Sequence, residues 1–387
     1  MNKQFNNIMI SLFLLFFGVY FNRAYGNAIP AAPEFNVKSY ILMDVNSGMV
    51  IAEKNSNART APASLTKIMT LYLTADALRN EKIHLHDSVV ISEKAWRTGG
   101  SKMFIKVGSS VSIQDLIKGV TVASGNDATI AIAEYLAGSE SAFVDMMNEV
   151  AHDLNMNDTN FGDCSGFSNE INYSTAYDLA ILSKAWLMRF PEYYSWFKDK
   201  WIIYNNIKQP NRNRLLWLDP SVDGIKTGYT EKAGYCLISS AERNNVRLLV
   251  VVLGAPNDNV RVNCSLTLLN YGFRYFDSLK IFSANTKINT AKTLFGKKNT
   301  IDLGLKEDLY VTLPKGETHS TKLKVKINIK KYYQAPIIKN QICGTLNVLF
   351  NNKIIMTKPL ISLKNNDRTN SVFVVFDYIK LWLQSKR

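Results

Sequence analysis

Residues 62–70 read Pro62-Ala63-Ser64-Leu65-Thr66-Lys67-Ile68-Met69-Thr70, and this stretch predicts the start of a helix. A proline stands upstream, and apolar residues follow at positions 65, 68, 69 and 72, the spacing of one helix face. Ser64 and Lys67 then share a face, because residues three apart are neighbours on a helix. The helix dipole favours a serine alkoxide at a helix N-terminus, and a lysine of lowered pKa can take the serine's proton. The pattern therefore indicates a serine–lysine nucleophile, although a capped surface helix gives the same pattern.

Two further motifs follow along the chain. Residues 124–126 read Ser-Gly-Asn, in a turn before a helical run over 128–136. Residues 226–228 read Lys-Thr-Gly and precede a strand-like run over 235–239. Each triplet alone says little. The three motifs in this order are hard to obtain by chance, and together they are the signature of serine β-lactamases and penicillin-binding proteins.

The surroundings of the motifs extend this likeness. They are Ser-Tyr-Ile-Leu-Met-Asp at 39–44, Asp127 after Ser-Gly-Asn, and Val-Asp-Gly-Ile-Lys-Thr-Gly-Tyr-Thr at 222–230. The chain resembles, over essentially its whole length, the D-alanyl-D-alanine carboxypeptidases among the low-molecular-weight penicillin-binding proteins. The resemblance implies an α+β fold with a penicillin-binding transpeptidase/β-lactamase-like domain, in which an antiparallel sheet is flanked by helices beside a helical part. A smaller all-β domain and a C-terminal amphipathic helix would follow.

Composition and periodicity divide the chain in a matching way. Lys3 precedes an apolar run that ends in small residues, which predicts a signal peptide over 1–26. The run is short for a membrane-spanning anchor, which needs about 20 apolar residues. Helical and strand patterns alternate over 27–285, the predicted D,D-peptidase catalytic domain, and a β-hairpin is expected over 39–52.

Short alternating strands over 286–366 predict a β-rich domain. A strand over 322–329 should place Leu, Val and Ile on one face, and Asn351-Asn352 should form a tight turn. The segment 367–387 is predicted to be an amphipathic helix that lies in the membrane interface. Its apolar stripe consists of Val372, Val375, Phe376, Ile379, Trp382 and Leu383. The alternative is a helix packed on its own β-domain, which also needs one apolar face.

The resemblance implies the roles of four catalytic residues. Ser64 is expected to be the nucleophile and Lys67 the base during acylation. Ser124 and Lys226 are expected to relay the proton to the leaving D-alanine. The two lysines should lower each other's pKa, as a lysine base near neutral pH requires.

The resemblance also implies the substrate-binding residues, which are Asn126, Thr227, Gly228, Tyr229, Arg212 and Arg261. Asn126 is expected to hydrogen-bond the substrate amide and Thr227 to contact the terminal carboxylate. The backbone N–H groups of Ser64 and Tyr229 are expected to form the oxyanion hole. Arg212 and Arg261 match positions near the substrate carboxylate, for which a guanidinium is suited. A solvated surface arginine is the alternative for each.

Charge and cysteine content narrow the class of partner. The net charge is +14, or +12 without the two basic residues of the signal peptide, and favours an anionic membrane surface and cell-wall polymer over nucleic acid. The four cysteines lack the spacing of metal ligands, and the four histidines lie in no motif, so no metal or cofactor is expected. Cys236 and Cys264 should be buried, and Cys164, in a polar loop, could be exposed.

The expected function is therefore that of an exported serine D,D-carboxypeptidase at the periplasmic face of the cytoplasmic membrane. It would remove the terminal D-alanine from peptidoglycan pentapeptide stems and be acylated by β-lactam antibiotics. A class A β-lactamase is one alternative, but it needs a glutamate for deacylation, and the surroundings of Glu170 do not resemble that loop. A D,D-endopeptidase and an inactive peptidoglycan-binding module are the others, and the module is disfavoured because every motif residue is intact.

Overall fold

The computed structural model describes residues 29–167, 171–317 and 321–369, and residues 374, 375, 377 and 378. The predicted signal peptide and most of the predicted C-terminal helix lie outside these residues. Within them, no helix is both long and apolar enough to cross a membrane.

The first region is built on a five-stranded antiparallel sheet with the strand order β2-β1-β9-β8-β7. Its strands are β1 (Ser39–Asp44), β2 (Val50–Lys54), β7 (Val222–Thr230), β8 (Gly234–Arg243) and β9 (Val246–Ala255). β1 and β2 form the predicted hairpin, and Gly48 in its turn has a φ of 76° that favours glycine. The Lys-Thr-Gly motif lies in β7, at the edge of the sheet.

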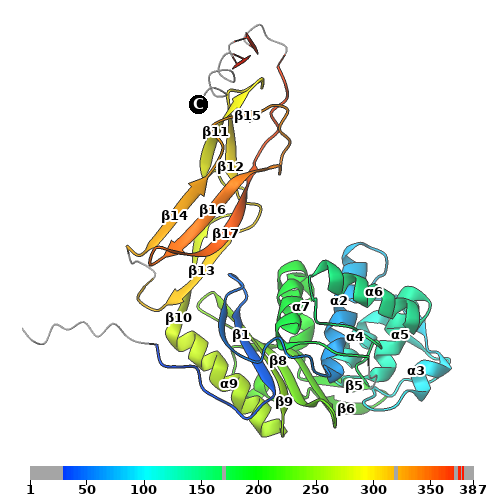
Figure 1. Cartoon of the computed structure of the whole chain (residues 1–387). Coiled ribbons are helices and arrows are strands. Elements are labelled where there is room, and N and C mark those ends of the chain that lie inside the picture. The colour runs from blue at the N-terminus through cyan, green and yellow to red at the C-terminus, as the bar shows by residue number, and fades with distance from the viewer. Residues whose placement is uncertain (1–28, 168–170, 318–320, 370–373, 376, 379–387) are drawn as a thin grey trace, which may run out of the picture. The chain divides into compact units, whose positions relative to one another are not determined.

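Helices cover both faces of this sheet (Figure 1). α9 (Asp258–Tyr275) packs on one face, where Gly272 lies close to Leu42 and Leu248. α2 (Lys67–Arg79) and α7 (Ala176–Arg189) share a hydrophobic core with Ile41 and Met43 on the other face. Because successive strand residues point to opposite faces, β1 is buried along its whole length.

The helical part holds the second motif next to α2. It contains α3 (Glu93–Arg97), α4 (Ile113–Thr121), α5 (Asn126–Ala137) and α6 (Glu140–Asp153). Ser112 and Ser139 cap α4 and α6, because each hydroxyl accepts a backbone N–H of the first turn. α5 packs against α2, so its first residue, Asn126, lies beside the predicted nucleophile.

Short elements connect these parts. They are β3 (Ser88–Val90), β4 (Ser110–Ser112), β5 (Trp201–Tyr204), β6 (Ile207–Pro210), the 3₁₀ helices η1 (Ala63–Thr66) and η2 (Pro191–Lys198), and α8 (Leu215–Leu218). β3 pairs with β4, and β5 pairs with β6 as a hairpin.

The second region is β-rich, as predicted. β10 (Phe276–Phe282) pairs with β13 (Leu309–Pro314), and a six-stranded sheet has the order β14-β16-β17-β12-β11-β15. The strands of this sheet are β11 (Asn289–Leu294), β12 (Thr300–Gly304), β14 (Leu323–Asn328), β15 (Tyr333–Gln334), β16 (Ile342–Phe350) and β17 (Lys353–Ser362). Asn351 and Asn352 form the predicted turn, both with positive φ.

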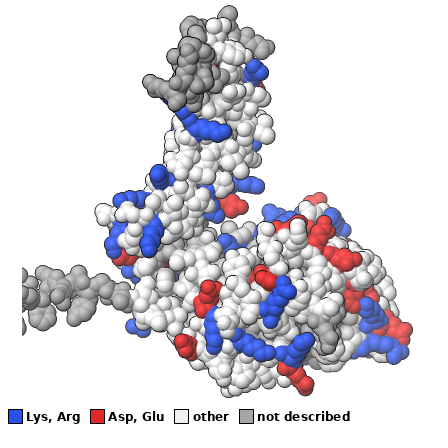
Figure 2. Space-filling model, in the orientation of Figure 1, with Lys and Arg blue, Asp and Glu red and all other residues white. Residues whose placement is uncertain are grey.

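The apolar face predicted for β14 is only partly confirmed. Leu323 and Ile327 pack against the core of this region, but Val325 is 39% exposed. β14 lies at the edge of its sheet, where the covering of its faces is incomplete. Figure 2 shows Lys and Arg side chains spread over the visible face of the molecule with Asp and Glu between them, so the positive charge is not gathered there in one patch.

Candidate active site

Ser64 lies in η1, the 3₁₀ turn that leads directly into α2. Its side chain is partly exposed, whereas Leu65, Thr66 and Lys67 are buried. β7 packs closely against this turn, since a Cβ built on Gly228 would lie 3.2 Å from the backbone nitrogen of Ser64. The site thus presents one accessible hydroxyl at the junction of a helix and a sheet edge.

Lys67 is fully buried and its amine has three acceptors. Nζ donates to Ser64 Oγ at 2.8 Å, to Asn126 Oδ1 at 2.7 Å and to the Ser165 carbonyl at 2.7 Å. Burial lowers the pKa of Lys67 to about 7, and Arg212 also lowers it, against the opposing effect of Asp163. A substantial fraction of the amine is therefore neutral near pH 7 and can accept a proton from Ser64.

Ser124 and Lys226 form a second serine–lysine pair. Lys226 Nζ donates to Ser124 Oγ at 2.8 Å and to the Thr227 carbonyl at 2.9 Å. Burial holds the pKa of Lys226 well below its ordinary value, and Lys67 and Arg212 lower it further. Of the predicted mutual effect, the lowering of the Lys226 pKa by Lys67 is confirmed, with burial the larger cause, whereas the causes that act on the Lys67 pKa are burial and other neighbours. Ser124 has a φ of 58°, a conformation that serine rarely adopts outside functional sites.

Asn126 binds the Lys67 amine and the neighbouring segment 99–104. Its Oδ1 accepts from Lys67, and its Nδ2 donates to the Gly99 carbonyl at 2.8 Å. Asp127, the next residue, is buried and accepts the backbone N–H groups of Met103 at 3.0 Å and Phe104 at 2.9 Å. The segment 99–104 is therefore fastened to the Ser-Gly-Asn motif by side chains of that motif.

The predicted carboxylate-binding residues lie along β7 and near its end. Thr227 and Gly228 are buried, and Tyr229 is 52% exposed with its ring 4.4 Å from that of Tyr235. Arg212 is exposed, and in the described part of the chain its guanidinium has neither a hydrogen bond nor an ion pair.

Arg261 has a different environment from the one predicted. It is 6% exposed and pairs with Asp258 at 2.6 Å. It also donates to the carbonyl oxygens of Gly228 and Cys236, each at 3.1 Å. The guanidinium of Arg261 therefore makes its hydrogen bonds within the protein, two of them to carbonyl oxygens of β7 and β8.

The loop 163–166 was not predicted to belong to the site. Asp163 Oδ1 accepts the backbone N–H of Ser165 at 2.8 Å, which fixes the carbonyl that binds Lys67. A Cβ on Gly166 would lie 1.8 Å from the Ala63 carbonyl, so the loop needs glycine there. The prediction that Cys164 could be exposed is wrong, since its thiol is buried and donates to Glu140 at 3.2 Å. All four cysteines are buried and free.

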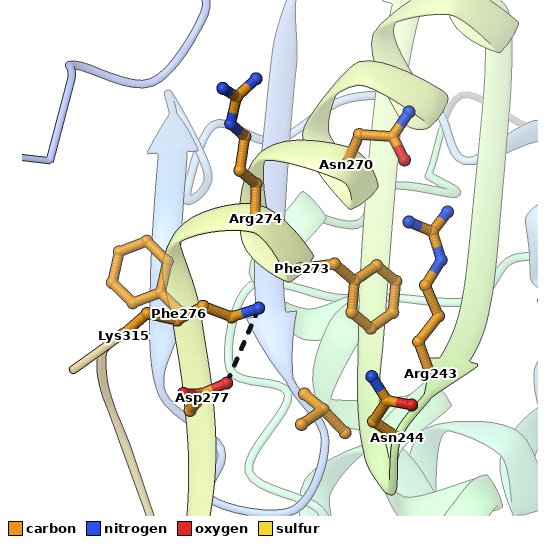
Figure 3. Close-up of a pocket in the computed structure, with 9 residues that line it drawn as sticks. Arg243, Asn244, Asn270, Phe273, Arg274, Phe276, Asp277 and Lys315 are labelled. Atoms are coloured by element: carbon orange, nitrogen blue, oxygen red, sulfur yellow. Dashed lines mark ion pairs between the residues drawn. The ribbon is translucent and has the colours of Figure 1, made fainter.

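A hollow of about 350 Å³ lies at the other end of β8 (Figure 3). Arg243 there pairs with Asp219 at 2.5 Å, and Lys315 with Asp277 at 3.9 Å. Figure 3 shows the Phe273 ring beside Arg243, whose guanidinium lies over it at 4.5 Å. None of the predicted site residues lines this hollow.

Comparison with known proteins agrees with this geometry. A family model for D-alanyl-D-alanine carboxypeptidase (Peptidase_S11) matches residues 27–257. The chain belongs to this family. A second model, for the C-terminal domain of penicillin-binding protein 5, matches residues 276–368.

Individual relatives support the family assignment along nearly the whole chain. D-alanyl-D-alanine carboxypeptidase DacC of Escherichia coli (strain K12) is 41% identical over 90% of this chain and 89% of its own. Penicillin-binding protein 5 from Haemophilus influenzae superposes with a TM-score of 0.81 at 38% identity, covering 88% of this chain and 100% of its own. Penicillin-binding protein D2 from Listeria monocytogenes, in an ampicillin-bound form, is 28% identical with a TM-score of 0.58, over 62% of this chain and 100% of its own.

The chain is therefore a serine-type D-Ala-D-Ala carboxypeptidase of the penicillin-binding proteins, as the sequence motifs indicated. The predicted α+β fold with a following β-rich domain is confirmed as well. The structure forms two hydrogen-bonded groups, Ser64 with Lys67 and Asn126, and Ser124 with Lys226. The groups are close enough for Lys67 to lower the pKa of Lys226. The contribution of Ser165 could not be found from the sequence, because it is a backbone carbonyl that any residue type supplies.

Proposed function

We propose that this carboxypeptidase works through an acyl-enzyme on Ser64, with Lys67 as the base. The observation that carries the proposal is the 2.8 Å contact between Lys67 Nζ and Ser64 Oγ beneath a partly exposed hydroxyl. When the amine is neutral, the same contact lets Ser64 donate its proton to Nζ as Oγ attacks the carbonyl carbon of the penultimate D-alanine. The backbone N–H groups of Ser64 and Tyr229 are proposed to stabilise the oxyanion.

Ser124 and Lys226 are proposed to carry a proton to the departing amine. Through their 2.8 Å hydrogen bond, Lys226 can return a proton to the Ser124 hydroxyl after that hydroxyl has given its own to the amine. The C–N bond then breaks, free D-alanine leaves, and a water molecule hydrolyses the ester on Ser64. Asn126 is proposed to bind the substrate amide through the Nδ2 hydrogen that Gly99 does not take.

Recognition of the terminal carboxylate is proposed to involve Thr227, Gly228 and Arg212. Thr227 supplies a hydroxyl on the edge strand, and Gly228 leaves room for the substrate against the turn of Ser64. Within the described residues the guanidinium of Arg212 has no hydrogen bond or ion pair and so is available to a substrate. Arg261 is proposed to act mainly by supporting Gly228, whose carbonyl it binds.

Labelled penicillin tests the nucleophile directly. Mass spectrometry of the labelled protein should find the adduct on the peptide that contains Ser64, and Ser64→Ala should abolish it. Adduct on another serine, or none in a preparation that releases D-alanine, would remove the proposal. Release of D-alanine from a free pentapeptide, without cleavage of cross-linked dimers, would separate the carboxypeptidase from the endopeptidase alternative.

We propose in addition that the protein is exported and held on the periplasmic face of the membrane by its C-terminal segment. The basic net charge and the apolar stripe of 372–383 support this location. The first turn of that segment contacts the β-rich region, because the backbone N–H of Phe295 donates to Asp377 at 2.8 Å and the rings of Phe295 and Tyr378 are 4.9 Å apart. Among the stripe residues that the structure describes, Val375 is 59% exposed and so is not covered by the β-rich region.

A further inference from the structure

Two half-exposed tryptophans stand on either side of Arg212 in the sequence. Trp201 of β5 and Trp217 of α8 are 49% and 42% exposed, and their rings meet edge to face with centroids 6.0 Å apart. Lys208 lies over the Trp201 ring at 4.6 Å and Lys200 over the Trp217 ring at 5.8 Å. Aromatic pairs of this geometry are attractive in themselves, so the two rings are held in fixed orientations while much of their surface faces solvent. We call these four side chains the aromatic platform.

The β5–β6 hairpin holds the aromatic platform outward because its strands alternate. Ile202 is buried, whereas Trp201 and Ile203 on either side of it are exposed and pair across the hairpin with Pro210 and Lys208. The outward face is thus apolar and aromatic with an ammonium group at its border.

The hairpin is fastened to the segment that borders the site. Gln209 Nε2 donates to the Lys102 carbonyl at 3.2 Å, and Asn205 Nδ2 to the Phe104 carbonyl at 3.1 Å. That segment is held by Asp127, the residue that follows the Ser-Gly-Asn motif. The chain also runs from β6 into Arg212, so the aromatic platform is continuous with the proposed substrate-binding residues.

We infer that the aromatic platform binds the polysaccharide strand that carries the stem peptide, an inference that rests on the proposed function. The C–H groups on one side of a sugar ring are weakly positive and fit the negative face of an indole ring. Hydroxyl and acetamido oxygens of the sugars can accept hydrogen bonds from Lys200 and Lys208. The stem peptides along the strand carry carboxylates that complement these ammonium groups.

The turn of the hairpin argues against insertion into a lipid bilayer at this place. The turn residues Asn205 and Asn206 are polar, and the Asn205 side chain is already bound to Phe104. Ile203 and Ile207 near the turn are exposed, but the large aromatic rings lie at the base of the hairpin, where Trp201 contacts Trp217. A polymer that lies along the surface fits this arrangement better.

The test compares two substrates with the full chain. Release of D-alanine is measured from insoluble peptidoglycan with pentapeptide stems and from the free pentapeptide. For Trp201→Ala/Trp217→Ala, the rate on peptidoglycan relative to that on the free peptide should fall about tenfold. Trp201→Leu/Trp217→Leu should give the same loss, because leucine keeps apolar area but has no ring face. Trp96→Ala is the matched control, a 40% exposed tryptophan with Arg97 over its ring, and should leave the ratio unchanged.

A binding experiment separates this inference from the proposed function. Ser64→Ala protein is sedimented with peptide-free glycan strands and, separately, with anionic phosphatidylglycerol vesicles. The tryptophan substitutions should weaken retention on glycan and leave vesicle binding unchanged. The inference is overturned if the alanine substitutions lower the rates on peptidoglycan and on the free pentapeptide equally, or if the leucine variant keeps the wild-type ratio of these rates. It is also overturned if the substitutions abolish binding to vesicles instead of binding to glycan. If wild-type protein releases no D-alanine at all, the proposed function fails, and glycan retention still decides on the aromatic platform. Thermal unfolding of each variant identifies any that do not fold.

Discussion

Arg212 and Arg261 are both arginines near the proposed carboxylate position, yet their substitution by alanine should change different quantities. Arg212 has no hydrogen bond or ion pair among the described residues, so Arg212→Ala breaks no polar contact there. If it binds the terminal carboxylate, one charge-assisted hydrogen bond of about 1.5–3 kcal/mol is lost, which lowers kcat/KM roughly tenfold to a hundredfold. The melting temperature should stay nearly constant.

Arg261→Ala should instead destabilise the protein. It breaks a buried ion pair and leaves the carbonyls of Gly228 and Cys236 without that donor, a change that costs about 3–5 kcal/mol in other proteins. We expect the lower end of this range of free energies, because Asp258 still has Arg214 as an ion-pair partner at 2.9 Å. A loss of about 3 kcal/mol corresponds to a fall in melting temperature of roughly 6–12 °C for a region of this size.

The assay is D-alanine release from the free pentapeptide together with thermal unfolding, for Arg212→Ala, Arg261→Ala and the control Arg214→Ala. Arg212→Ala should lower kcat/KM and leave the melting temperature unchanged, whereas Arg261→Ala should lower the melting temperature. Arg214→Ala removes an exposed pair and should move the melting temperature by at most a few degrees. The reasoning is refuted if Arg212→Ala leaves kcat/KM unchanged, or if Arg261→Ala reduces kcat/KM at full stability.

Three further predictions follow from the site and from the C-terminal segment. The rate of penicillin acylation should rise about tenfold per pH unit below pH 7 and level off above it, because Lys67, with its pKa of about 7, must be neutral to act as base; a flat profile between pH 5 and 7 would contradict this. Asp163→Ala should slow acylation, because the Ser165 carbonyl that binds Lys67 is no longer held in place. It should also shift the pH profile of acylation to lower pH, because loss of a nearby negative charge lowers the pKa of Lys67. An unshifted pH profile would be inconsistent with this role of Asp163. Deleting 379–387 keeps Asp377 and Tyr378, and should give a folded, penicillin-binding protein that no longer sediments with membranes; continued sedimentation would mean that the segment is not the anchor.

Features that depend on neighbours in sequence could be predicted well. The helix after Ser64, the hairpin over 39–52 and the turn at Asn351-Asn352 follow from periodicity and turn residues. The domain boundaries at 26, 285 and 366 remain predictions. The pairing of β10 with β13 joins residues from 276 onward to the β-rich region, a long-range contact with no local signal.

Features that depend on distant partners could not be predicted. The burial of Arg261 depends on its bonds to the carbonyl oxygens of Gly228 and Cys236, residues that only the fold brings near it, whereas its partner Asp258 is a neighbour on the same helix. Cys164 lies in a polar loop and is nevertheless buried, because the loop packs under η1 where Gly166 meets the Ala63 carbonyl. Polar sequence around a residue describes its neighbours in the chain, which here are not its neighbours in space.

The site keeps two lysines reactive by surrounding them with neutral acceptors. Lys67 and Lys226 donate only to serine hydroxyls, an amide oxygen and backbone carbonyls among the described residues. A carboxylate in direct contact would favour the ammonium form and raise each pKa toward its ordinary value. Asp127 and Asp163 are close enough to raise the pKa of Lys67, yet their oxygens are taken by backbone N–H groups of Met103, Phe104 and Ser165. The same two carboxylates therefore fix the loops of the site without binding the lysine amines. Burial can then keep the pKa of Lys67 at about 7, as its proposed role as a base requires.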